Sequence, residues 1–118
     1  ILVAGALLML AHVAEAQVPP VKNPSALMFT SADHDSATAY EIDIVKLDNT
    51  VLQTITVLKV DTTVVAGEVV VSLNVQPITF GSYTFRARVL VGSLESVNST
   101  PSDVWERAPG APGKPRAQ

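Results

Sequence analysis

The clearest alternation of apolar and polar positions lies in residues 81–89. Its apolar members are Tyr83, Phe85, Ala87 and Val89. Its polar members are Thr84, Arg86 and Arg88. A period of two is typical of a strand with one buried and one solvated face. This stretch therefore predicts the best-defined strand of the chain.

Shorter stretches with the same character lie on either side of it. The pattern predicts strands at residues 26–30, 40–44, 51–60 and 67–75, and an interrupted last strand at 94–104, where Pro101 removes one ladder donor. Residues 31–38 and 61–67 are expected to be a loop and a looser link. Helical periodicity is absent between residues 17 and 108. The predicted fold class is therefore all-β, an antiparallel sandwich of six or seven strands.

The front of the predicted domain is reduced. Residues 18–25 contain Pro19, Pro20 and Pro24. Because proline has no N–H for a ladder bond, this stretch predicts an extended lead-in or a broken edge strand. The first strand of the sandwich is thus expected to be abbreviated.

The N-terminal segment has the character of a targeting signal. Residues 1–14 are apolar except for His12, and Ala14-Glu15-Ala16 has the small-x-small pattern of a signal-peptidase site. We expect residues 1–16 to be a signal peptide lacking its own start, and cleavage before Gln17. The apolar run is short for a stable membrane span. An interfacial anchor helix is the alternative. The predicted location is secreted, extracellular or at the cell surface.

The remaining organisation is one domain at residues 17–108 and a Pro/Gly-rich linker or tail at 109–118.

Charge and cysteine content exclude several classes of function. Eight basic and 11 acidic residues form no basic stripe, so nucleic acid is not an expected partner. The sequence has no cysteine, which excludes disulfides, thiolate metal sites and cysteine nucleophiles.

The second half of the chain resembles a fibronectin type III domain. Residues 78–89 resemble that family's corner and sixth strand, and residues 95–96 and 99–102 resemble its last strand. Residues 40–44 resemble its third strand. The resemblance covers about residues 20–107 and is firmest over 78–102. It implies an immunoglobulin-like sandwich in which Tyr83 is the tyrosine-corner residue, its hydroxyl bonded to upstream backbone.

The same resemblance bears on the two ends of the domain. It implies that Phe29 stands where the family has a buried tryptophan in its second strand. Residues 111–116 resemble the lead-in to a further repeat, so the chain is expected to be the first module of a longer extracellular protein. Met28 and Phe29 are predicted to be core residues, as are Tyr40, Tyr83 and Phe85. Trp105 is predicted to be a core or cap residue, with a binding aromatic as the alternative.

Candidate chemistry is sparse. Asp33-His34-Asp35 could ligate a divalent cation. A solvated loop with an Asx-type turn is favoured instead. His34 is the only histidine outside the predicted signal, and no nucleophile elbow accompanies it. We therefore expect no enzyme, no metal and no cofactor. Asn98-Ser99-Thr100 is an acceptor sequon for glycosylation at Asn98.

Four outward charges are expected to pair. In the family's topology the strand bearing Glu41 and Asp43 lies beside the strand bearing Arg86 and Arg88. The favoured interpretation is a solvated ion ladder, each pair contributing roughly 0.2–1 kcal/mol. The alternative is a recognition face for a partner.

These features predict a secreted, non-catalytic binding or adhesion module with a protein partner. Carbohydrate is a weaker expectation, because Trp105 is the only tryptophan. The alternative is a structural spacer or self-assembling subunit of a surface layer or filament. Its support is the broken first strand, which suits strand exchange between neighbouring copies.

Overall fold

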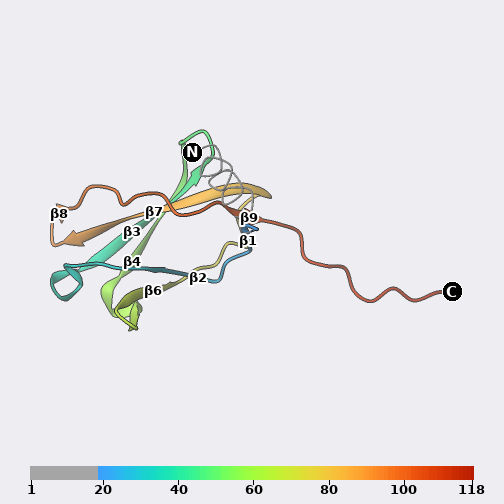
Figure 1. Cartoon of the computed structure of the whole chain (residues 1–118), viewed down its shortest axis with the longest axis horizontal. Coiled ribbons are helices and arrows are strands. Elements are labelled where there is room, and N and C mark those ends of the chain that lie inside the picture. The colour runs from blue at the N-terminus through green and yellow to red at the C-terminus, as the bar shows by residue number, and fades with distance from the viewer. Residues whose placement is uncertain (1–18) are drawn as a thin grey trace, which may run out of the picture.

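The computed structural model describes residues 19–118, so the predicted signal at residues 1–16 lies outside the described residues. Strands in this part of the chain form two open sheets packed as a sandwich (Figure 1). The larger sheet has the order β1 (Val21–Lys22), β9 (Trp105–Arg107), β7 (Gly81–Val91), β3 (Ala39–Lys46), β4 (Val51–Leu58), with β8 (Leu94–Glu95) also paired to β7. The smaller has the order β2 (Ala26–Phe29), β6 (Glu68–Ser72), β5 (Thr63–Val65). Two 3₁₀ turns, η1 (His34–Ser36) and η2 (Lys59–Asp61), connect strands.

The all-β prediction is confirmed, but the expectation of a purely antiparallel sandwich is wrong. β1 pairs with β9 in parallel, with Val21 opposite Trp105. Asn23, in a left-handed conformation with φ 48°, holds this arrangement. Its side-chain amide accepts from the backbone N–H of Ala108 and donates to the carbonyl of the same residue, both at 3.0 Å. The reduced first strand is thereby tied to the end of the last one.

The strand count also exceeds the six or seven expected, because the short strands β5 and β9 lie outside the predicted strands. β5 lies in a stretch predicted to be a looser link. β5 and β6 form a hairpin whose central residues, Ala66 and Gly67, both have positive φ, at 52° and 81°. Two left-handed residues characterise the type I′ turn, which matches the twist of the flanking strands.

Replacing Ala66 by Asn is expected to stabilise the domain by about 0.5–1 kcal/mol. An alanine in the left-handed region carries a steric cost of roughly 1–2 kcal/mol, and asparagine tolerates that region better. Chemical denaturation measures the change in the free energy of unfolding. Ala66→Val is the matched control and should destabilise. A loss of stability in Ala66→Asn would contradict the turn assignment.

The core lies between the two sheets. Its fully buried members are Tyr40, Ile42 and Ile44 from β3 and Val69 and Val71 from β6. Phe85, on the neighbouring strand β7, packs in the same cluster. The ring of Trp105 stacks on it with centroids 4.7 Å apart. Trp105 is 3% exposed and belongs to the core.

Tyr83 occupies the position that its strand pattern predicts. It is buried, and its hydroxyl donates to the carbonyl oxygen of Thr79 at 2.8 Å, four residues upstream. Phe29 meets Tyr40 edge-on, with centroids 5.2 Å apart. The expectation that Met28 belongs to the core is wrong. Alternation along β2 turns Leu27 and Phe29 toward the core and Met28 to the opposite face, where it is 50% exposed.

Candidate functional site

The four predicted charges meet on the outer face of the larger sheet. The β3–β7 register places Glu41 opposite Arg88 and Asp43 opposite Arg86. One oxygen of Asp43, Oδ2, accepts from Nε of Arg86 at 2.8 Å and from Nη1 of Arg88 at 2.6 Å. Its other oxygen, Oδ1, accepts from the hydroxyl of Thr54 on β4 at 2.7 Å. Both carboxylate oxygens of Asp43 are therefore satisfied.

The expectation that these charges form a solvated ladder is wrong in one respect. The side chain of Asp43 is only 2% exposed and that of Arg88 only 14% exposed. The reason is that β3 is flanked on both sides, so that Thr54 from β4 and the two arginines from β7 together cover the carboxylate. Asp43 is therefore buried and the two arginines are partly buried, so that their ionic interactions are less screened by solvent than surface pairs are.

Arg88 connects this cluster to the segment after β8. Its Nη1 donates to Oδ1 of Asn98 at 2.8 Å, and its Nε lies 2.6 Å from Oε1 of Glu95. Its Nη2 lies 3.3 Å from Oε2 of Glu41. Asn98 itself is exposed, and its glycosylation stays a prediction.

The ionisation of the cluster is strongly biased toward the charged forms. Burial favours the neutral form of Asp43, but hydrogen bonds from Arg88, Arg86 and Thr54 outweigh it and hold the pKa of this carboxyl well below its usual range. The hydrogen bond to Asp43 likewise raises the pKa of Arg88, against the effect of burial. Asp43 is thus an anion at neutral pH, and both of its oxygens are already occupied by hydrogen bonds within the chain.

The segment after β8 was expected to be an interrupted strand, and it is not a strand. Instead every third residue faces β7, namely Ser96, Ser99 and Ser102, which we call the serine ladder. Their N–H groups donate to the carbonyls of Val89, Ala87 and Phe85 at 2.8–3.0 Å. Their hydroxyls accept from the N–H groups of the same residues, also at 2.8–3.0 Å. A hydroxyl thus replaces a backbone carbonyl in each pair.

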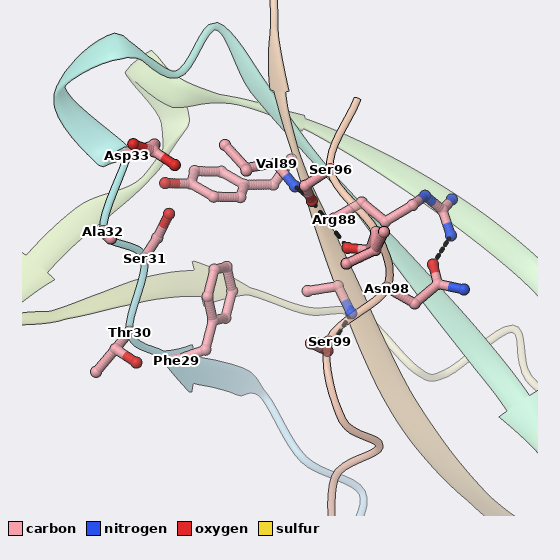
Figure 2. A pocket seen from close by; sticks show the side chains of 13 residues that line it. Phe29, Thr30, Ser31, Ala32, Asp33, Arg88, Val89, Ser96, Asn98 and Ser99 are labelled. Atoms are coloured by element: carbon pink, nitrogen blue, oxygen red, sulfur yellow. Dashed lines mark hydrogen bonds between the residues drawn. The ribbon is translucent and has the colours of Figure 1, made fainter. Parts of the chain in front are cut away.

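A groove runs between the serine ladder and β2, and we call it the β2 groove. Its first hollow, of about 290 Å³, lies between Phe29 on β2 and Ser99 on the ladder (Figure 2). A second hollow shares Phe29 and Ser99 with the first, and a third shares Leu27 with the second. The three are therefore contiguous along the whole of β2. Most of the lining is apolar, with Phe85 and Ala87 between the two walls.

One wall of this groove is an unpaired sheet edge. The N–H of Leu73 donates to the carbonyl of Ser25, which lies opposite it if the β2–β6 register is extended by one residue. Because hydrogen-bonded and non-bonded pairs alternate in an antiparallel ladder, Leu27 and Phe29 also bond to β6. The backbone groups of Ala26 and Met28 must then point away from β6. Among the described residues no strand pairs with this edge.

Trp105 borders the third hollow of the β2 groove. Its indole Nε1 is buried and has no hydrogen-bond partner among residues 19–118. A buried indole N–H usually has a partner, so this atom is a free donor beside the groove.

Asp33 and Asp35 lie exposed in a short connecting segment, as the favoured interpretation expected, but without its Asx-type turn. Asp33 precedes η1 without a side-chain cap bond, so the predicted Asx-type turn is not formed there. His34 turns inward and its Nδ1 lies 2.7 Å from the hydroxyl of buried Tyr40, with the two rings stacked. No group of three histidine or acidic side chains suited to a metal ion occurs in the described part of the chain.

The groove and the serine ladder were both missed from the sequence. The spacing of serines at 96, 99 and 102 is a signal that could have revealed the ladder. The groove has no local signal, because it arises where β1 leaves β2 and joins the larger sheet instead.

The chain matches no model of a protein family, no curated protein and no solved structure. Over residues 19–118, no helix has the length and apolar character needed to cross a membrane. The fold shown is a β-sandwich of a mixed and an antiparallel sheet. The likeness to fibronectin type III domains rests on the sequence features described above.

Proposed function

We propose that this chain is a secreted, non-catalytic binding module of the fibronectin type III kind, and that it binds an extended segment of a protein partner in the β2 groove. The observation that carries the proposal is the unpaired edge of β2 beside a contiguous apolar hollow. An extended peptide adds a strand to such an edge through main-chain hydrogen bonds, and places alternate side chains in the hollow. The predicted signal segment supports an extracellular setting.

The distribution of aromatic side chains favours a protein partner over a carbohydrate. Sugar platforms need exposed rings, whereas Tyr40, Tyr83 and Trp105 are buried. Phe80 is 64% exposed, but the guanidinium of Arg107 lies over its ring, 5.0 Å from the centroid. A peptide needs only the free backbone groups of Ala26 and Met28 and the apolar lining that the groove supplies.

Selection from a displayed library of random linear peptides tests the proposal, with the chain as bait. We expect selected peptides to alternate apolar and polar residues. Their binding should fall at least tenfold in Met28→Pro, because this change removes an N–H that faces the free edge and not the β6 ladder. Val64→Pro, on the opposite edge of the same sheet, is the control for a proline on an exposed strand and should bind normally.

Two outcomes would overturn the proposal. One is a failure to select any peptide, with the chain shown to be folded by the fluorescence of its single tryptophan. The other is selection of peptides that bind Met28→Pro as tightly as the unmodified chain. Circular dichroism of both proline variants separates a lost binding edge from a lost fold.

A further inference from the structure

The outer edge strand of the larger sheet has no charged residue and no proline. β4 forms this edge, since no strand pairs with its far side in the described part of the chain. Most of its eight residues, Val51–Leu58, are exposed. Long uncharged edge strands invite pairing with another strand, and proteins usually protect them with lysine, proline or a bulge. β4 has an irregularity only near its start, opposite Ile44 and Val45.

The backbone groups available on this edge follow from the ladder. The N–H of Lys59 donates to the carbonyl of Thr38, which lies opposite it if the β3–β4 register is extended by one residue. Alternation then directs the backbone groups of Gln53, Ile55 and Val57 toward β3. Those of Thr54, Thr56 and Leu58 face away from the sheet, without a partner among the described strands.

We infer that β4 pairs antiparallel with β4 of a second copy of this chain, about a two-fold axis passing near Thr56. In that register Thr56 lies opposite itself, and Thr54 lies opposite Leu58 of the second copy. Each of the three residues then donates and accepts once across the interface. The two larger sheets become one continuous sheet.

The edge is self-complementary, which is why we assign a second copy of the chain as its occupant. In this register no charged residue meets a like charge, because Lys59, the first charge after the strand, lies opposite the neutral Gln53 of the second copy. A parallel arrangement would instead bring Lys59 close to its own counterpart. Opposed threonines are a favourable cross-strand pair. The contact is isologous and therefore closes as a dimer.

The inference is independent of the β2 groove, which lies along the edge of the other sheet. β4 and β2 belong to different sheets, so a dimer formed through β4 leaves β2 free for a peptide. Failure of the peptide selection and failure of dimerisation are thus separate results.

Light scattering coupled to size-exclusion chromatography, over a range of concentrations of the full chain, tests the dimer. We expect the unmodified chain to be a dimer and Thr56→Lys to be a monomer, since two lysines would face each other across the axis. This variant should remain folded, because position 56 lies opposite Glu41 on β3. Thr63→Lys, on the exposed edge strand β5, is the matched control and should remain a dimer.

Three results would overturn the inference. The first is a monomeric unmodified chain at every concentration. The second is an equal effect of Thr56→Lys and Thr63→Lys on association, which would place the contact elsewhere. The third is open-ended polymers, because a two-fold contact cannot generate them.

Discussion

Replacing Asp43 by alanine is expected to lower the free energy of unfolding by about 3–5 kcal/mol, the range typical when one partner of a buried ion pair is removed. The change leaves the guanidinium groups of Arg86 and Arg88 without the carboxylate that both of them contact. It also removes the acceptor of the Thr54 hydroxyl. Unfolding in urea, followed by the fluorescence of buried Trp105, measures the loss.

Glu41→Ala is the matched control for this prediction. Glu41 faces the same Arg88 from the same strand, but its side chain is 24% exposed and its contact is longer, at 3.3 Å. Its loss should cost about 1 kcal/mol or less, as exposed pairs do. Equal losses in Asp43→Ala and Glu41→Ala would show that the cluster acts as a solvated ladder and not as a buried one.

The pH dependence of stability gives a second measurement of the same cluster. The pKa of Asp43 is depressed in the folded chain, while an unfolded aspartate titrates near about 3.9. The stabilisation is therefore fully present above the unfolded pKa, and it is lost as the pH falls from there toward the lower folded pKa. In Asp43→Asn the loss of stability between about pH 4.5 and pH 2 should be clearly shallower. An unchanged slope would assign the acid sensitivity to other carboxylates.

The partners in this cluster could be predicted from the sequence, but its burial could not. Alternation within residues 40–44 and 81–89 places the four charges on one face, and the family topology places the two strands side by side. What alternation does not reveal is the register in which β4 pairs with β3. Thr54 approaches Asp43 only because β4 pairs with the far side of β3, in a register that no single stretch of sequence specifies.

Two other errors have local physical causes. The turn of the β5–β6 hairpin was missed because its first central residue is Ala66, whereas type I′ turns are usually signalled by asparagine or glycine there. The parallel β1–β9 pair was missed because it depends on Asn23, which bonds to Ala108 from 85 residues away. Proline content correctly predicted a reduced first strand, but not which sheet that strand would join.

Loss of the serine ladder hydroxyls should have an effect of similar size to the loss of Asp43. Replacing Ser96, Ser99 and Ser102 together by alanine is expected to cost about 2–5 kcal/mol. Each change leaves one N–H of β7 without its acceptor. The loss is roughly 1–2 kcal/mol each for the partly buried donors of Phe85 and Ala87, and less for the exposed donor of Val89. The alanine variants keep the backbone N–H that donates to β7, so the segment can still lie in place. Urea denaturation of the triple variant measures the total.

Amide hydrogen exchange distinguishes this mechanism from general loosening of the domain. In Ser99→Ala the amide of Ala87 should lose protection, while those of Phe85 and Val89 keep theirs, because Ser102 and Ser96 still accept from them. Ser99→Thr retains a hydroxyl and should restore protection at Ala87. Thr100→Ala, beside the ladder but without a side-chain bond to β7, is the control. Uniform loss of protection along β7 in Ser99→Ala would contradict a ladder of separate hydroxyl bonds.

The reason the ladder carries this much stability is geometric. A strand presents every second residue to its neighbour, but the ladder presents every third, so that three of its residues accompany two residues of β7. With that period the backbone alone can supply one bond per repeat to β7, and each hydroxyl supplies the second. Pro101 fits this arrangement, since it lies between two ladder positions and needs no N–H there. Moving one serine by a single position, as in Ser99→Ala with Thr100→Ser, should therefore fail to restore either stability or protection of Ala87.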